Sequence, residues 1–261
     1  MPAGAQANSR IHYSTMSRVF HARAVSSYGA VLGLGLLFCA YAAPATDPTG
    51  FPFTNETLNY TVNWPSGLSL GEAHISAMRT KSGEGPEQWN FDMTLDAGIP
   101  GFAVSDHYRS TATLELCALT LEKQYQHGSR KIRELTTFDQ HAGVARRETT
   151  GGGKSDITVS DCAKDALTFL YYARRELGQG RVPPFQTVLF GASYQVRLEY
   201  TGAQTVRVND KKAEADRLVA TLKGPASELS FEMLFARDPA RTPLVIRVPL
   251  SLGMFSMELA R

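Results

Sequence analysis

Apolar and polar side chains alternate strictly along many short stretches of this chain. The clearest stretch is residues 89–96, where Trp89, Phe91, Met93 and Leu95 alternate with asparagine, aspartate and threonine. A period of two places apolar side chains on one face of a β-strand and polar side chains on the other. About a dozen such stretches follow one another with turn residues between them, so a mostly antiparallel β domain is predicted.

One segment breaks this period and predicts a helix over about residues 162–177. Leu167, Leu170 and Tyr171 recur there at helical spacing, and Gly178 is a suitable residue for the helix end. The predicted fold is therefore a curved antiparallel sheet, either an incomplete β-barrel or a sandwich, with one central α-helix packed on its concave side. We expect this helix to pack against four strand residues, Trp89, Phe91, Phe231 and Met233.

The N-terminal segment has the order of a secretory signal peptide. Arg18 and Arg23 precede a short apolar run at residues 31–38, and Ala40-Tyr41-Ala42 forms a small-x-small cleavage site. We therefore expect a signal peptide over residues 1–42, with Met16 as an alternative start. A flexible lead over residues 43–52 and a single exported β-rich domain over residues 53–261 would follow.

Export sets both the compartment and the interpretation of the cysteines. The periplasm or cell envelope is the expected location, and the alternative is a retained N-terminal membrane anchor. Cys39 lies in the signal peptide, which leaves Cys117 and Cys162. In an oxidising compartment an isolated pair of cysteines predicts a disulfide, and no Cys-x-x-Cys motif or nearby histidine indicates a metal site.

The charge pattern excludes some classes of partner. Lysine and arginine total 27 residues against 25 acidic residues, for a net charge of +2, and no basic tract interrupts the chain. Nucleic-acid binding is therefore not expected. No apolar segment after the signal peptide is long enough to span a membrane as a helix.

The sequence shows no catalytic constellation. His74, His107, His127 and His141 lack the spacing of zinc sites, and no Gly-x-Ser-x-Gly motif is present. We therefore expect no catalytic residues, no metal and no cofactor, which favours a non-enzymatic role. Arg174 lies near the predicted helix end, where a cation interacts favourably with the helix dipole.

In the second half of the chain, Gly202 is interpreted as a turn between two strands.

Four groups of residues carry a resemblance that spans nearly the whole exported domain. They are residues 56–62 with Gly71-Glu72-Ala73, residues 137–139, residues 165–174, and residues 235–238 with 241–244. In this order they resemble a bacterial exported-protein family, periplasmic and β-rich, known only as a domain of unknown function. The resemblance implies a fold and a compartment but no activity. Cys117 departs from the family pattern, and its pairing with Cys162 would tie a hairpin turn to the helix start.

Three functions are consistent with these observations. The first is a non-catalytic binding module for an apolar ligand such as a lipid, because an open β-barrel can hold one. Its candidate ligand-binding residues are Trp64, Trp89, Phe102 and Tyr172. The second is an envelope protein that is structural or binds a protein partner, for example through the apolar loop at residues 98–102. The third is a hydrolase.

Overall fold

The computed structural model describes residues 55–81, 83, 85–99, 101–250 and 253–260. The predicted signal peptide and the flexible lead lie outside these residues. Among the described residues, fifteen strands form a single sheet together with one helix, α1, Ala166–Gly178. The strands of the first half are β1 Asn55–Asn63, β2 Ser69–Lys81, β3 Glu87–Ile99, β4 Phe102–Ala112, β5 Ala118–His127, β6 Arg130–Asp139, β7 Val144–Thr149 and β8 Lys154–Thr158. Those of the second half are β9 Lys164–Asp165, β10 Gln186–Leu189, β11 Ser193–Val208, β12 Lys211–Lys223, β13 Glu228–Ala236, β14 Pro243–Leu250 and β15 Gly253–Leu259.

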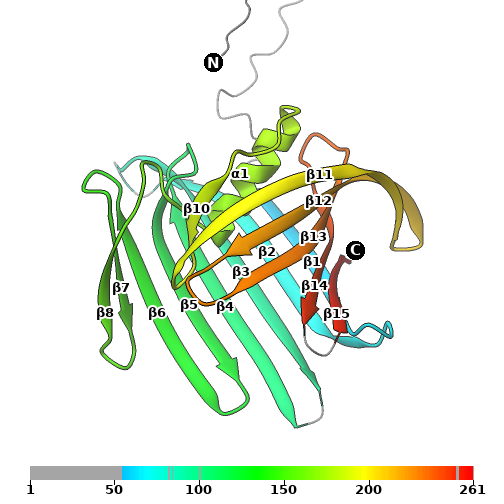
Figure 1. Cartoon of the computed structure of the whole chain (residues 1–261), viewed down its shortest axis with the longest axis horizontal. Coiled ribbons are helices and arrows are strands. Elements are labelled where there is room, and N and C mark those ends of the chain that lie inside the picture. Colours follow the sequence, from blue (N-terminus) through cyan, green and yellow to red (C-terminus); the bar gives the residue numbers. More distant parts are fainter. Residues whose placement is uncertain (1–54, 82, 84, 100, 251–252, 261) are drawn as a thin grey trace, which may run out of the picture. The chain divides into compact units, whose positions relative to one another are not determined.

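The sheet is a long meander in which chain neighbours pair antiparallel. Two pairings depart from this rule, because β1 pairs with β15 and β9 pairs parallel to β10. The sheet order therefore runs from β8 through β1 and β15 to β9. Figure 1 shows that the sheet curves, so that β1–β8 face β11–β15 across a trough that holds α1. The predicted fold class is confirmed as a large open curved sheet that is not closed into a barrel.

Helix α1 fills one end of this trough and buries side chains on both of its sides. Leu167 and Tyr171 belong to a core with Trp89 and Phe91, and the Phe91 and Tyr171 rings stack with centroids 4.5 Å apart. On the other side, Phe169, Ala173 and Leu177 pack with Met233, Phe231 and Phe235. The expected packing of Leu167 and Tyr171 is thus correct for Trp89 and Phe91. Leu170, the third residue of the expected helix face, borders both cores and so also packs against the core that holds Met233 and Phe231. Leu167 and Tyr171 belong to the first core alone, because the helix lies between two walls and presents a different face to each.

The helix begins at Ala166, whereas the sequence suggested a start near residue 162. The residues just before it, Lys164 and Asp165, instead form the short strand β9, which pairs with Val188 and Leu189 of β10. Asp165 is then the N-cap, and its Oδ1 accepts from the Leu167 and Thr168 amides at 2.8 and 3.0 Å. A side-chain oxygen at this position satisfies amides that have no partner within the helix.

The structure also differs from expectation around Gly202. It lies inside β11, where the pairing with β12 shifts register between Tyr200 and Gly202. A glycine in the interior of a strand commonly marks a bulge rather than a turn. The strand therefore continues for sixteen residues and bends at the position where the sequence suggested a chain reversal.

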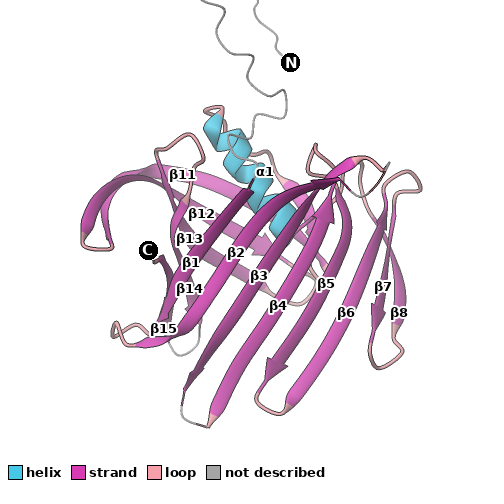
Figure 2. Ribbon diagram, turned by 180° about the vertical axis from the view of Figure 1, so that it is seen from behind, coloured by secondary structure: helices cyan, strands magenta, loops and turns pink. Residues whose placement is uncertain are grey.

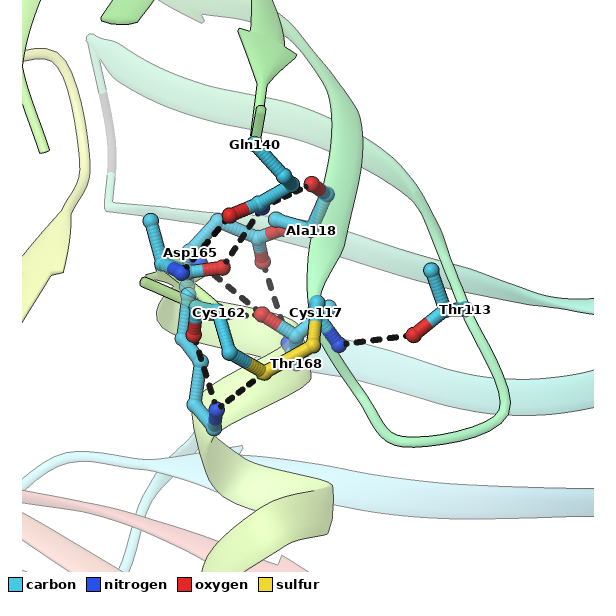
Figure 3. Close-up of a disulfide and its surroundings, with 9 residues drawn as sticks. Thr113, Cys117, Ala118, Gln140, Cys162, Asp165 and Thr168 are labelled. Carbon is cyan, nitrogen blue, oxygen red and sulfur yellow. Dashed lines mark hydrogen bonds between the residues drawn. A yellow bond between two sulfur atoms is a disulfide. The ribbon is translucent and has the colours of Figure 1, made fainter. Parts of the chain in front are cut away.

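A disulfide ties the segment before the edge strand β9 to the turn between β4 and β5. Cys117, in the turn between β4 and β5, bonds to Cys162 just before β9, with 4.5 Å between the Cα atoms (Figure 3). The Ala118 amide donates to the Ala163 carbonyl at 2.8 Å. The Gln140 side chain bridges the same strands, donating to the Ala118 and Ala163 carbonyls and accepting from the Ala163 amide. The disulfide predicted from the cysteine count is therefore present.

Asp165 is fully buried, and its ionisation should make stability depend on pH. Burial raises the pKa of its carboxyl from 3.8 to about 6, opposed by hydrogen bonds from Ser110, Thr168 and Leu167. The folded protein therefore holds a proton between about pH 4 and pH 6 that the unfolded chain releases. Because the folded state binds more protons there, its stability falls as the pH rises through this window and levels off above it.

We expect Asp165→Asn to remove this dependence. Asparagine keeps an acceptor oxygen for the helix amides and cannot ionise. At about 1.36 kcal/mol for each pKa unit, the wild type should lose about 2 kcal/mol relative to the variant between pH 4 and pH 7. Urea unfolding of both proteins at several pH values measures this difference. A difference that stays constant with pH would show that Asp165 is ionised in the fold throughout.

Candidate functional site

An apolar pocket occupies the end of the trough away from helix α1. Its volume is about 370 Å³, and it lies between strands β1, β3 and β4 on one side and strands β14 and β15 on the other. Ser256 is the single residue with a polar side chain along its described wall. Side chains that shape the wall include Trp64, Leu95, Phe102, Ile246, Phe255 and Met257. Ligand pockets of proteins have volumes of about 300–1,000 Å³ and are mostly apolar, so this cavity has the size and chemistry of a binding site.

The pocket exists because side-chain size falls along the inner face of β3. Near the helix that face carries Trp89 and Phe91, which are 1% and 2% exposed and fill the trough. Toward the other end it carries Leu95 and then Ala97, which both line the pocket. At Ala97 a methyl group stands where a ring would fill the space, and the pocket lies beside it. The next residue, Gly98, adds no side chain.

Aromatic rings from two chain segments form the side of the pocket opposite β3. The Trp64 and Phe255 rings meet edge to face, with centroids 4.9 Å apart. Trp64 begins the turn between β1 and β2, in which its amide donates to the Leu68 carbonyl at 2.8 Å. Edge-to-face aromatic pairs are favourable beyond the area they bury, so this contact fixes the wall of the pocket.

The structure brings together two of the four aromatic residues proposed as ligand contacts. Trp64 and Phe102 both line the pocket. Trp89 instead lies in the core, where its ring stacks 5.9 Å from Phe91. Tyr172 projects from α1 and packs under two cations, Lys164 at 4.6 Å and Arg175 at 5.3 Å from its ring centre. Ligand contact by any of the four residues stays a prediction.

The sequence reasoning missed the rest of the wall. Leu70, Leu95, Phe255 and Met257 also line the pocket. Alternation identifies Leu95, Phe255 and Met257 as inward-facing, so for these three the signal was present in the sequence. Leu70 is out of phase with Ala73 and Ile75, because the pairing of β1 with β2 shifts register beside it. Alternation does not distinguish an inward residue that fills the core from one that borders a void, because that depends on how far the helix reaches along the trough.

A polar cluster adjoins the pocket on the same face of β4 and β5. Val104, which lines the pocket, pairs with His127, and the next inward residue of β4 is Asp106. Asp106 accepts from Tyr108 Oη at 2.8 Å and lies 2.9 Å from His127 Nε2. Burial and the neighbouring Asp106 carboxylate raise the pKa of Tyr108, which keeps that phenol protonated. These groups satisfy one another's hydrogen bonds at the edge of the apolar wall.

Deeper in the same face, charged side chains form a second, buried group. The Lys123 ammonium lies 3.3 Å from Glu134, and Arg147 lies 2.7 Å from the other oxygen of that carboxylate. The ring of Phe190, from the turn before β11, covers Lys123 with its centre 4.3 Å from the ammonium. Burial lowers the pKa of Lys123, and the Glu134 carboxylate opposes this shift. Each charge is paired, which is the usual condition for burying charged groups.

Arg174 has a different environment from the one its sequence position suggested. It donates two hydrogen bonds to the Glu56 carboxylate, at 2.6 and 2.8 Å, and its side chain is fully buried. Tyr171 Oη also donates to Glu56, at 3.2 Å. The interpretation of Arg174 as a cation placed for the helix dipole is therefore incomplete, because its main partner lies 118 residues away on β1.

Two further properties bear on function. Among the described residues, no group of three histidine, cysteine, aspartate or glutamate side chains is placed to hold a metal ion. The helix in the described part of the chain is also neither long nor apolar enough to cross a membrane.

The fold and the pocket together define an open, curved β-sheet domain with an apolar cavity at one end of its trough. The chain belongs to the family described as Protein of unknown function (DUF3108), whose model matches residues 59–260. The predicted membership of a β-rich family of unknown function is confirmed. A comparison with curated proteins finds no match.

Two solved structures are similar to this chain. One is a β-barrel-like protein of the domain of unknown function DUF1849 from Brucella abortus, which is 8% identical with a TM-score of 0.53. The match covers 80% of this chain and 96% of that one, and it shows a shared fold. The other, from Bacteroides fragilis, is described as an exported protein with YMCC-like fold. It is 8% identical with a TM-score of 0.36, and the match covers 81% of this chain and 96% of that one.

Proposed function

We propose that this domain is an exported, non-catalytic binding module that holds an apolar chain, such as a lipid acyl chain, in the pocket. The observation that carries the proposal is the apolar wall, formed by side chains such as Trp64, Phe102 and Phe255. Each methylene transferred from water to such a surface contributes about 0.8 kcal/mol. A linear alkyl chain therefore suits this site better than a polar metabolite does.

Two features support a binding role over a catalytic one. The polar groups nearest the pocket are engaged with each other, as in the contacts of Asp106 with Tyr108 and His127. The described lining of the pocket contains no cysteine or histidine, and its one serine is Ser256. Ser256, which lines the pocket, donates to Glu258 at 2.9 Å on its own strand.

Export to the periplasm or cell envelope is part of the proposal. The order of charge, apolar run and small residues in segment 1–42 supports it. The Cys117–Cys162 bond supports it independently, since structural disulfides persist in oxidising compartments and are rare in the cytosol. An envelope protein of this kind would encounter lipids as its most abundant apolar ligands.

A substitution that fills the pocket tests the proposal. Ala97 lines the cavity, so Ala97→Phe places a ring in the space proposed for the ligand. We expect protein purified from the producing cell to carry a co-purifying lipid, detected by native mass spectrometry and lipid extraction. The Ala97→Phe variant should carry at least about tenfold less, because a ring displaces several methylenes worth about 0.8 kcal/mol each.

Ala103→Phe is the matched control. Ala103 is exposed on the opposite face of β4, next to pocket residue Val104, so the same ring is added outside the cavity. This variant should retain the lipid at the wild-type level. Equal melting temperatures of the two variants would exclude unfolding as the cause of lipid loss. Wild-type protein free of lipid, or Ala97→Phe protein that retains it, would contradict the proposal.

A further inference from the structure

Exposed apolar side chains gather at the mouth of the pocket. Leu68, Phe102 and Met254 are 66%, 48% and 45% exposed. They lie at or next to the first residues of β2, β4 and β15, and these strands begin at the end of the trough away from α1 (Figure 2). We call these three residues the rim. Exposure of large apolar side chains to water is unfavourable. An exposed apolar patch therefore commonly marks a contact surface.

Contacts between the turns show that the rim is one continuous surface. A Cβ atom on Gly253, beside Met254, would lie 2.6 Å from Pro65 Cγ in the β1–β2 turn. Gly67 and Met254 border the same shallow depression. Phe102 reaches this group through the pocket, whose wall it shares with Trp64 and Phe255. The rim therefore lies beside the pocket, with Phe102 shared between the two.

A basic turn lies directly beside the rim. The turn between β5 and β6 packs on Phe102, because a Cβ atom on Gly128 would lie 3.3 Å from its ring. The Gly128 amide also donates to the Ala103 carbonyl at 2.8 Å. Arg130 and Lys131, which begin β6 directly after this turn, are exposed, and neither forms a salt bridge with a described residue. Basic side chains next to apolar ones fit a surface that is apolar inside and anionic at its boundary.

Acidic residues are absent from the sequence of these turns. Residues 64–68, 98–102, 128–131 and 250–254 contain no aspartate or glutamate, although such residues are frequent elsewhere in the chain. Trp64 also stands at the edge of the pocket, and tryptophan is enriched at membrane–water interfaces. The charge and the composition of the rim therefore complement the surface of an anionic lipid bilayer.

We propose that the rim docks on an anionic lipid bilayer, with the mouth of the pocket against the membrane. Leu68, Phe102 and Met254 insert at the level of the headgroups, and Arg130 and Lys131 lie over anionic phosphates. An acyl chain then enters the pocket without crossing water. The inference rests on the proposed lipid-binding function for its purpose, although the docking itself can be measured without any bound ligand.

Vesicle flotation tests the docking. The probe is vesicles of phosphatidylcholine with about 30% phosphatidylglycerol, mixed with protein purified after export. We expect the wild type to float with these vesicles and much less with phosphatidylcholine alone. Leu68→Ser with Met254→Ser should lower the partition coefficient at least about tenfold, since it removes two inserting side chains. Neither residue lines the pocket, so lipid binding inside it should be retained.

Met78→Ser with Phe185→Ser is the matched control, because these side chains are 48% and 59% exposed and lie outside the described wall of the pocket. It should partition within about twofold of the wild type. Arg130→Glu with Lys131→Glu should remove the preference for phosphatidylglycerol. Wild-type protein that floats with neither vesicle, or a rim variant that floats as well as the control, overturns the proposal. If the wild type floats with neither vesicle, the interpretation of the rim as a surface that binds a protein partner replaces the docking proposal.

The pocket variant separates the two proposals. Ala97→Phe should float like the wild type while carrying much less lipid, because it changes the cavity and leaves the rim intact. If it neither carries lipid nor floats, docking depends on an occupied pocket and the rim alone is insufficient, which overturns the docking proposal. If the wild type floats but never carries lipid, docking stands and the proposed function fails.

Discussion

Replacing Arg174 by methionine should lower the free energy of unfolding by about 3–5 kcal/mol. Its guanidinium makes a two-point contact with Glu56, donates to the Ala240 carbonyl at 3.1 Å and stacks 4.8 Å from the Tyr171 ring centre. The Glu56 side chain is only 11% exposed. Without Arg174, the Glu56 carboxylate stays largely out of water, and the Tyr171 hydroxyl is its one remaining described donor. Breaking a buried ion pair in this way is costly, because it leaves a buried charge without its partner.

Urea unfolding at pH 7 measures this loss, and two comparisons isolate its cause. Arg146→Met removes an arginine whose partner Asp156 lies 3.9 Å away, with both side chains about two-thirds exposed. It should cost less than about 1 kcal/mol. Adding Glu56→Leu to Arg174→Met removes both charges and should restore most of the stability. A loss below about 1 kcal/mol in the single variant would show that water reaches Glu56 and compensates for the missing arginine.

This pair also shows what sequence could and could not predict. Alternation along residues such as 89–96 is a local property, so it located strands and one helix with little information from elsewhere. The Arg174–Glu56 contact joins residues 118 positions apart, and it depends on how the sheet curves around the helix. No local pattern encodes that curvature, so the sequence offered only the weaker explanation from the helix dipole.

The same limit applies to the candidate site. Trp64 and Trp89 both follow apolar alternation and both face the inside of the sheet. Only one borders the pocket, because α1 fills the trough near Trp89 and ends before Trp64. The position of the helix end relative to the strands thus decides which inward residue is core and which is wall. Gly202 illustrates a further ambiguity, since a glycine can reverse a chain or permit a bulge, and only the pairing of β11 with β12 distinguishes the two.

Reduction of the Cys117–Cys162 bond should destabilise the domain by about 4 kcal/mol at 25 °C. The bond closes a loop with a sequence separation of 45 residues, and the chain-entropy model assigns that loop about this amount. The loss should not abolish the fold, because Gln140 and the Ala118–Ala163 hydrogen bond still join the same strands (Figure 3). Urea unfolding with and without a reductant measures the difference.

The double substitution Cys117→Ala with Cys162→Ala provides the control. It should match the reduced wild type in stability and be insensitive to the reductant, since no other cysteine lies in the predicted exported domain. Hydrogen exchange should locate the effect. Amides of residues 113–118 and 159–165 should exchange faster after reduction, because the bond ties these two segments together. Those of β1–β3 should follow only the global loss, because the bond does not touch these strands. An unchanged unfolding midpoint after complete reduction would mean that Gln140 and its backbone partners hold this junction by themselves.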